Sequence, residues 1–422
     1  MTKRKATPSK IKRFFKILGP GLITGASDDD PSGIATYSQA GAQFGLGTLW
    51  TALITFPLMA AIQEMCARIG IVTSQGLTTN IKNHYPKPVL YLMIVFTLPA
   101  VILNIGADIA GMGAVANLIF PSIPSYFFTV GFTGILILLI IYLPYQKMAA
   151  FLKYLCVFLL LYLIVPFLSK QNWGDIVKHT FIPTIHFDKD FISILVAILG
   201  TTISPYLFFW QATMEAEDVQ HKKRKLIVNK RVIQKMDWDV DLGMFFSNLV
   251  MFFIILTAGT VLFNGGIHNI DTVEQAAKAL EPLAGKLSYL LFAIGVIGTG
   301  FLAIPVLCGC LSYILSETFG WNGGLDKKYF QAKPFYWVVI VSLLIGLAIN
   351  YIGISPVQAL IYTAILYGIT SPVLIAVILH IGNNKKVMKE FTNGNWSNIL
   401  GIIALLLMTA SACVLLYFQF MT

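Results

Sequence analysis

Three consecutive aspartates followed by a proline interrupt a long apolar stretch near the start of this chain. They lie in the hexapeptide at residues 28–33 (DDDPSG), within a stretch that runs from residue 14 to residue 50. A bilayer offers no water to unpaired backbone groups, so a broken helix is tolerated at membrane depth only where it is buried in protein or lines a wet cavity. Ionisable side chains at that depth are costly and usually mark the path of an ion or substrate. The hexapeptide therefore predicts a transport site.

The composition indicates a protein that crosses a membrane many times. Of 422 residues, 56% are hydrophobic and 12% are charged, whereas a soluble domain carries about twice that charged fraction. Apolar stretches of about 20 residues, the length that crosses a bilayer core, recur along the chain. We therefore expect an all-α polytopic protein of the plasma (inner) membrane, with about eleven spans by hydropathy. They are predicted near residues 17–45, 47–71, 89–117, 125–145, 150–169, 192–216, 239–264, 284–317, 334–353, 356–381 and 397–419.

The distribution of basic residues predicts the orientation. If the N-terminus is cytoplasmic, 25 of the 30 Lys and Arg residues fall in cytoplasmic segments, as the positive-inside rule requires. The C-terminus is then outside, and the basic residues 1–16 form a cytoplasmic extension without the cleavage site of a signal peptide. Because the basic residues cluster in alternate loops, we expect lipid and not nucleic acid as the partner. The run at residues 221–225 is predicted to be a topology signal, with lipid-headgroup binding as the weaker alternative.

A second interruption repeats the first. The first span breaks at Asp30-Pro31 and the sixth at Ser204-Pro205. Five spans separate the two breaks, so they would have opposite topologies, and paired interrupted helices point to a substrate site near the bilayer midplane. Proline removes a backbone donor and clashes with the preceding turn. Carbonyls freed in this way are candidate ligands, and the half-helix ends add partial charges.

Asp30 is the first candidate ligand for a cation. It directly precedes Pro31, and a carboxylate with carbonyls and water suits magnesium or manganese. Asp30 could also cap the second half-helix, with Pro31 at its first position, and the two roles are compatible. Asp28 and Asp29 lie on the same short stretch, and at least one of them is expected to line a vestibule or pair with a neighbour.

The second break offers hydroxyl groups. Thr201 and Ser204 are three residues apart, so they share a helix face. Their hydroxyls could contact an ion directly or through water, or could bond to the preceding helical turn, as is common in membranes. Tyr206 could donate to the substrate or simply pack.

For the other charged residues in the spans, a structural role is favoured over a role in transport. Asp108 could be a relay or coupling residue, but a structural role in bonding polar groups of the bundle is favoured. Glu64 and Arg68 are four residues apart and are expected to form a structural ion pair. Three further acids open the seventh span from the cytoplasmic side and suit a helix start instead of a binding site: Asp237, Asp239 and Asp241. Residues 272–282 are expected to form a short amphipathic helix.

No signature of an enzyme stands out. The sequence has no phosphate-binding glycine-rich loop with its lysine and no metalloprotease motif, so no cofactor is expected beyond a transported ion. The six histidines fall in loops or near a span end, which weakens a proton relay through imidazole. The cysteines lie in apolar runs and are expected to be packing residues. Cys308 and Cys310 could ligate a soft metal, but such a site would need more ligands nearby.

Several motifs together resemble the NRAMP family of divalent-metal transporters. They are residues 19–21 (GPG), 30–33 (DPSG), 35–36 (AT), 39–45 (QAGAQFG), 63–73 (QEMCARIGIVT) and 107–110 (ADIA). The resemblance implies alternating access and an amino-acid-transporter-like fold of two inverted five-helix repeats, with helices 1 and 6 broken. The repeats would cover residues 17–169 and 192–381, followed by an eleventh helix and the C-terminus (397–422).

The departures from the family pattern concern the ion site. Gly33 stands where the family has Asn, Ser204 where it has a metal-binding Met, Tyr206 where it has His, and Gly111 where it has an acid; Thr201 replaces a small residue. A thioether helps to select manganese and iron, so its loss removes a soft ligand. The missing side chains would leave room for an ion that keeps its waters, as magnesium does. The pattern is similar to that of the NRAMP-related magnesium transporters, thought to move a hydrated ion without proton coupling.

Four hypotheses follow. The first is a secondary transporter of divalent cations, with magnesium favoured and manganese tolerated, in which Asp30 binds the ion and Thr201, Ser204 and freed carbonyls orient its water shell. The second is proton-coupled uptake of manganese or iron, with a proton route through Asp28, Asp29 or Asp108. The third is transport of a small anion such as bicarbonate, drawn to a half-helix N-terminus, with a coupling sodium at Asp30. A non-transporting receptor is disfavoured because no sizeable soluble domain is present. The sequence makes no prediction of the oligomeric state.

Overall fold

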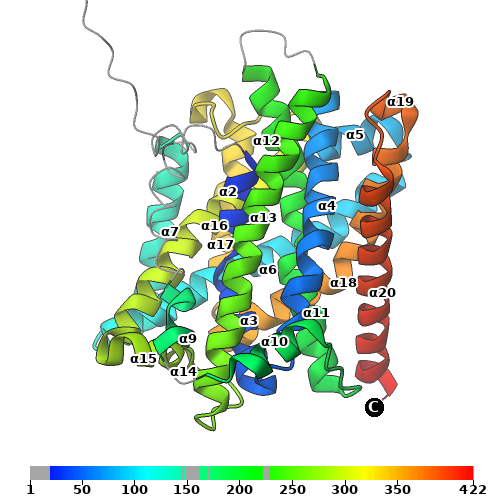
Figure 1. Ribbon diagram of the computed structural model, residues 1–422. Coiled ribbons are helices and arrows are strands. Elements are labelled where there is room, and N and C mark those ends of the chain that lie inside the picture. The colour runs from blue at the N-terminus through cyan, green and yellow to red at the C-terminus, as the bar shows by residue number, and fades with distance from the viewer. Residues whose placement is uncertain (1–19, 145–146, 148–160, 169–170, 222–227, 422) are drawn as a thin grey trace, which may run out of the picture.

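The computed structural model describes residues 20–144, 147, 161–168, 171–221 and 228–421, and its regular elements in these ranges are helices (Figure 1). The α-helices are α2 (Pro20–Asp28), α3 (Pro31–Phe44), α4 (Trp50–Thr73), α5 (Leu77–His84), α6 (Lys87–Ile119), α7 (Ser125–Tyr142), α9 (Val165–Leu168), α10 (Trp173–Phe181), α11 (Lys189–Thr202), α12 (Pro205–His221), α13 (Lys230–Ala258), α14 (Val273–Ala277), α15 (Glu281–Ala284), α16 (Ser288–Phe319), α17 (Lys333–Ile349), α18 (Pro356–Asn383), α19 (Lys385–Met388) and α20 (Asn395–Met421). A π-helix, η2 (Gly259–Phe263), extends α13, and the 3-10 turns are η3 (Lys278–Leu280), η4 (Gly285–Leu287) and η5 (Tyr329–Gln331).

The helices confirm an all-α, multi-pass membrane protein. Eight helical segments of the described residues are long and apolar enough to cross a bilayer, and α17 is a shorter apolar helix. Ten of the predicted spans coincide with helices or pairs of half-helices. The predicted span at residues 150–169 lies mostly outside the described residues. The amphipathic segment at 272–282 is helical, as predicted, and starts with a capping box between Thr272 and Gln275.

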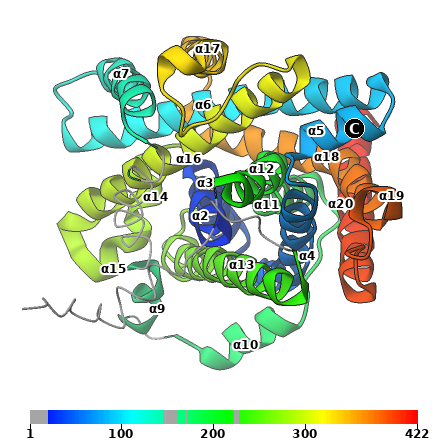
Figure 2. The same cartoon turned by 90° about the horizontal axis from the view of Figure 1, so that it is seen from above.

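The two broken helices occupy the middle of the bundle. Viewed from above, α2, α3, α11 and α12 are surrounded by α4, α13, α16, α18 and α6 (Figure 2). In the side view α2 lies above α3 whereas α12 lies above α11, so the two broken helices run in opposite directions (Figure 1). This antiparallel pair confirms the predicted inverted arrangement of breaks one and six.

Each break occurs where the sequence predicts it. The first helix ends at Asp28 and resumes at Pro31, with Asp30 in an extended conformation (φ −74°, ψ 172°) as the N-cap of α3. The second ends at Thr202 and resumes at Pro205. Because proline lacks an N–H and its ring clashes with the preceding turn, it is well suited to the first position of a helix. Prolines also lie inside α4, α6, α16 and α18, which continue past them. A proline alone therefore does not set a break, and at the first break the Asp30 cap adds to it.

Glycines let the broken helices approach their neighbours at backbone contact. A Cβ on Gly21 would lie 2.7 Å from the Cα of Val240 in α13, and one on Gly41 would lie 2.8 Å from the Cβ of Ala258. Similarly, a Cβ on Gly200 of α11 would lie 2.8 Å from the Cα of Gly368 in α18. Helix packing in lipid depends on such small residues, since apolar side chains alone give no advantage over lipid tails. The first broken helix is thus packed along α13, and α11 is packed on α18.

One sequence prediction about α13 is wrong. This helix begins at Lys230, where the Asn229 side chain accepts hydrogen bonds from the N–H groups of Arg231 and Val232. The acids predicted to suit a helix start therefore lie inside the helix: Asp237, Asp239 and Asp241. The error arises because hydropathy marks the apolar part of a helix, whereas its polar turns extend beyond the bilayer core.

Candidate functional site

Asp30 is buried, with 1% of its surface exposed, and its carboxylate is held by three donors. Its Oδ1 accepts hydrogen bonds from the Ser32 hydroxyl at 2.7 Å and the Gly33 N–H at 2.8 Å. Its Oδ2 accepts one from Nδ2 of Asn104, on α6, at 2.9 Å. The carboxylate thus caps α3, where the positive end of the helix dipole favours its charge. The capping role considered from the sequence is therefore present in the structure.

Asp28 and Asp29 turn away from Asp30 toward α13. The Ser247 hydroxyl lies 2.7 Å from Oδ2 of Asp28 and 3.3 Å from Oδ1 of Asp29. Both carboxylates are buried, and Oδ1 of Asp28 makes no hydrogen bond to the described residues. No three Asp, Glu, His or Cys side chains converge as a metal-binding group anywhere in the described ranges. The aspartates of the hexapeptide therefore face two different helices.

The two hydroxyls predicted to share a helix face have different environments. Thr201 faces the first break, with its Oγ1 3.5 Å from Oγ of Ser32. Ser204 donates to the carbonyl of Thr201 at 2.6 Å and to that of Gly200 at 3.2 Å. Bonding to the preceding turn, the alternative considered above, thus describes Ser204 in this conformation.

Tyr206 connects the two breaks directly. Its hydroxyl donates to the carbonyl of Ser27, at the end of α2, at 3.0 Å. The Ser371 hydroxyl, on α18, donates to the carbonyl of Ile203 at 3.0 Å. The expectation that breaks leave carbonyls free as ligands is wrong for these two carbonyls, because side chains from other helices already satisfy them.

Changing Tyr206 to phenylalanine should lower the free energy of unfolding by about 1–3 kcal/mol, since the Ser27 carbonyl would stay buried without its donor. Thermal or chemical unfolding of the purified protein measures the loss. Tyr362→Phe on α18, where the tyrosine is 52% exposed, is the matched control and should change stability little. Equal stability of the Tyr206 variant and the wild type would contradict a structural link between the breaks.

Two positions where family side chains are missing have close neighbours in this conformation. A Cβ on Gly33 would lie 3.3 Å from the Tyr37 ring and 3.4 Å from Oγ1 of Thr201. A Cβ on Gly111 would lie 3.2 Å from Cδ1 of Leu360, and a cavity of about 20 Å³ is lined by both residues. A cavity of that size holds about one water. The expectation that the missing side chains leave room for a hydrated ion stays a prediction.

The ends of the first broken helix are tied to the rest of the bundle. At the start of α2, the Gly21 N–H donates to Oδ2 of Asp239 at 2.8 Å, and Thr24 hydrogen-bonds Gln211 of α12. In α3, Oε1 of Gln39 accepts from the N–H of Ile270 at 2.8 Å. These contacts hold both halves of the helix around the buried Asp30.

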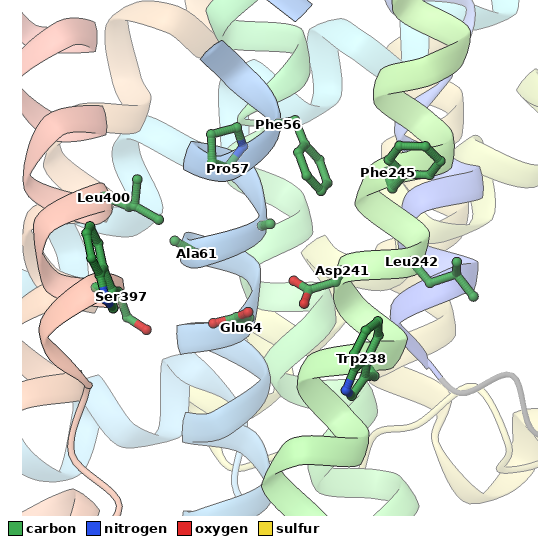
Figure 3. A pocket seen from close by; sticks show the side chains of 12 residues that line it. Phe56, Pro57, Ala61, Glu64, Trp238, Asp241, Leu242, Phe245, Ser397 and Leu400 are labelled. Carbon is green, nitrogen blue, oxygen red and sulfur yellow. The ribbon is translucent and has the colours of Figure 1, made fainter. Parts of the chain in front are cut away.

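An open cavity lies elsewhere, between α4, α13 and α20 (Figure 3). Its volume is about 470 Å³, and Figure 3 shows the carboxylates of Glu64 and Asp241 pointing toward one another across it. Neither Asp30 nor Thr201 lines this cavity. Beside it the predicted pair is present, with Arg68 3.7 Å from Glu64, and Arg68 also lies 3.4 Å from Asp237. This cavity is therefore not the site predicted at the helix breaks.

Replacing Arg68 with methionine should lower the free energy of unfolding by about 1–3 kcal/mol, because two partly buried acids, Glu64 and Asp237, would lose the cation beside them. Chemical denaturation measures the loss, and the double variant Arg68→Met/Glu64→Gln should recover part of it. Losses that simply add in the double variant would contradict the ion-pair account.

Asn104, Ser247 and Asp108 surround the hexapeptide from other helices. No local pattern around Ser247 indicates that it faces the aspartates. Asn104 precedes Asp108 by four residues on α6, a spacing that places both on one helix face. Asp108 is completely buried, and neither carboxylate oxygen makes a hydrogen bond of normal geometry to the described residues. Its carboxylate does interact with the backbone N–H of Ser32, so the choice between a structural and a coupling role stays open.

Comparison with known proteins establishes the family. The model of the natural resistance-associated macrophage protein-like (Nramp) family matches residues 21–418. The match covers nearly the whole chain, so the chain belongs to this family.

Curated relatives are named divalent metal cation transporter MntH. The protein of Caldanaerobacter subterraneus subsp. tengcongensis is 26% identical over 402 residues, which cover 93% of this chain and 91% of the relative. That of Clostridium acetobutylicum is 25% identical over 427 residues, covering 100% and 95%.

Solved structures confirm the fold. A crystal structure of the Eremococcus coleocola manganese transporter, in complex with an aromatic bis-isothiourea substituted compound, matches with a TM-score of 0.75 and 18% identity, covering 99% of this chain and 89% of that one. The inward-facing conformation of Mhp1, an inverted-repeat protein, matches with a TM-score of 0.52 and 12% identity, covering 94% and 90%. The two inverted five-helix repeats expected from the resemblance are therefore the fold of this protein.

Proposed function

We propose that this chain is a secondary transporter of divalent metal cations that favours Mg²⁺, tolerates Mn²⁺ and is not coupled to protons. The observation that carries the proposal is the buried Asp30 carboxylate at the break of the first helix. A buried ionisable group in a membrane span is by default a functional site. The names of the MntH relatives support divalent metal as the substrate class, and transport in place of catalysis.

The ligands offered around Asp30 are hard. Its carboxylate accepts hydrogen bonds from the side chains of Ser32 and Asn104, and the Thr201 hydroxyl, at the second break, lies 3.5 Å from that of Ser32. Oxygen ligands suit Mg²⁺ and Mn²⁺, whereas a thioether would favour softer ions. Mg²⁺ gives up its waters reluctantly, so Thr201 and Ser204 would act by orienting retained waters once the helices have separated.

Alternating access would open one end of the first broken helix at a time. One end is closed by the contacts of Gly21 with Asp239 and of Thr24 with Gln211, and the other by the contact of Gln39 with Ile270. With the N-terminus cytoplasmic, release of α2 would open the site to the inside. A membrane potential of 100 mV supplies about 2.3 kcal/mol per charge for uptake, so a divalent ion needs no proton to be accumulated.

Flux measurements in proteoliposomes test this function. A potential that is negative inside should drive Mg²⁺ uptake without a change of internal pH, and Mn²⁺ should compete with it. The proposal would be overturned if the protein moved Mn²⁺ only together with protons, or moved no divalent ion at all.

Proton-coupled manganese uptake is the second candidate. Three buried acids near the break, Asp28, Asp29 and Asp108, favour it because they could carry protons. Acidification of the vesicle interior during Mn²⁺ uptake would select it. The third hypothesis, anion transport, is weakened because the Gly33 N–H at the start of α3 already donates to the negatively charged carboxylate of Asp30, which occupies the place where an anion would bind.

A further inference from the structure

We propose that the cation bound at Asp30 is also held by Asp108, with Oδ1 of Asn104 and the hydroxyl of Tyr367 as neutral ligands. The ligands would then come from α3, α6 and α18, whereas the sequence pointed to α3 and α11. This inference rests on the proposed function, because it assigns further ligands to the same ion.

The four side chains meet around the start of α3. Asn104 binds Asp30 through Nδ2 at 2.9 Å, which leaves its Oδ1 as an acceptor. Asp108 follows one helical turn later on the same face of α6, close to the Ser32 backbone and within electrostatic range of Asp30. Tyr367 lies beside Asn104, within electrostatic range of both carboxylates. One ion could therefore contact groups from all three helices.

Four oxygen atoms at this place lack a hydrogen bond of normal geometry to the described residues: Oδ1 of Asn104, both carboxylate oxygens of Asp108 and the hydroxyl of Tyr367. The three side chains are at most 1% exposed. Buried polar atoms are nearly always paired, so a group without a well-formed hydrogen bond calls for an explanation such as a bound ion or water. Two of the four oxygens belong to the Asp108 carboxylate, and all four lie near the carboxylate of Asp30, which favours a cation.

The buried negative charges give an independent reason to expect a cation between these residues. Asp30 and Asp108 are both buried, and neither forms an ion pair with a described Lys, Arg or His. Removing charges from water is costly unless an opposite charge compensates them. A divalent cation between Asp30 and Asp108 would neutralise both at once.

The chemistry of the set favours a hard ion. Two carboxylates, an amide oxygen and a phenol oxygen provide oxygen ligands only, which suit Mg²⁺ or Mn²⁺. Mg²⁺ demands near-octahedral geometry and usually keeps several waters. Two or three of these protein ligands with water in the remaining positions would satisfy it.

Replacing Asp108 with cysteine tests whether this residue binds the metal directly or only supports the other ligands. The experiment measures equilibrium binding of Mg²⁺ and Cd²⁺ to the full-length protein in nanodiscs, for the wild type, Asp108→Asn and Asp108→Cys. We expect both variants to bind Mg²⁺ at least 10-fold more weakly than the wild type. Asp108→Cys should bind Cd²⁺ at least 10-fold more tightly than Asp108→Asn does, because a thiolate prefers soft metals. Thr133→Cys on α7, a buried position on a helix that contributes no ligand to this set, should leave the affinities for both ions unchanged.

The outcomes separate this inference from the proposed function. If Asp30→Asn abolishes Mg²⁺ binding while both Asp108 variants keep the wild-type affinity, the ligand role of Asp108 is overturned and the proposed function stands. If Asp108→Cys loses Mg²⁺ without a gain for Cd²⁺, Asp108 is not a ligand. If Asp30→Asn binds Mg²⁺ as the wild type does, the proposed site itself is wrong.

A further variant tests the inference if Asp108→Asn fails to fold. Tyr367→Phe is expected to weaken Mg²⁺ binding threefold or more. An unchanged affinity would count against the proposed ligands Asp30, Asp108, Asn104 and Tyr367.

Discussion

Replacing Asp30 with asparagine should reduce the initial rate of Mg²⁺ uptake into proteoliposomes by about two orders of magnitude. Asparagine is also a good N-cap, so α3 should still form and the two half-helices should keep their places. The change removes the charge that attracts the ion, and truncating one partner of a buried charged contact costs about 2–5 kcal/mol. A loss of about 2.8 kcal/mol corresponds to a factor of 100 in affinity.

Asp271→Asn is the matched control for this variant. Asp271 lies on the surface, in the segment between η2 and α14, and the same chemical change there should leave uptake unaltered. If the Asp30 variant carried Mg²⁺ at more than half of the wild-type rate, while the folded fraction was equal, the site assignment would be refuted.

Changing Gly25 to valine should destabilise the protein by about 3 kcal/mol or more. A Cβ on Gly25 would overlap the backbone carbonyl of Gly243 in α13, and backbone atoms in a long helix cannot move aside as a flexible side chain can. Overpacking of this kind typically costs 1–3 kcal/mol and occasionally more. The expected result is a marked fall in the temperature at which the detergent-solubilised protein loses its monodisperse peak.

Gly134→Val on α7 provides the control for the Gly25 variant. A Cβ on Gly134 meets no atom within 4 Å, so valine there should leave stability within about 1 kcal/mol of the wild type, since helix propensity favours it slightly over glycine. Similar losses at both positions would mean that the packing of α2 on α13 does not depend on backbone contact.

The features that could be predicted from the sequence depend on local chemistry. Hydropathy locates the spans because their length must match the bilayer, and Asp30-Pro31 fixes both the break and the cap of α3 because Asp is a good N-cap and Pro a good first residue. The pair of Glu64 and Arg68 follows from helical spacing alone. In each case the interacting groups lie within a few residues of one another.

The features that could not be predicted depend on contacts between distant segments. Ser247 faces Asp28 and Asp29 across more than 200 residues of chain, and no local pattern announces that contact. The donors that occupy the carbonyls of Ser27 and Ile203 also come from other helices. The approach of Leu360 to Gly111 is likewise a contact between distant segments, in an interior that is close-packed.

The position of a bound metal tests the central claim most directly. Mn²⁺ scatters X-rays anomalously, so crystals of the protein soaked in manganese should show an anomalous peak within about 2.5 Å of a carboxylate oxygen of Asp30. The peak should disappear in crystals of Asp30→Asn treated in the same way. A manganese peak that lies away from the break between α2 and α3, and that persists in the variant, would contradict the account.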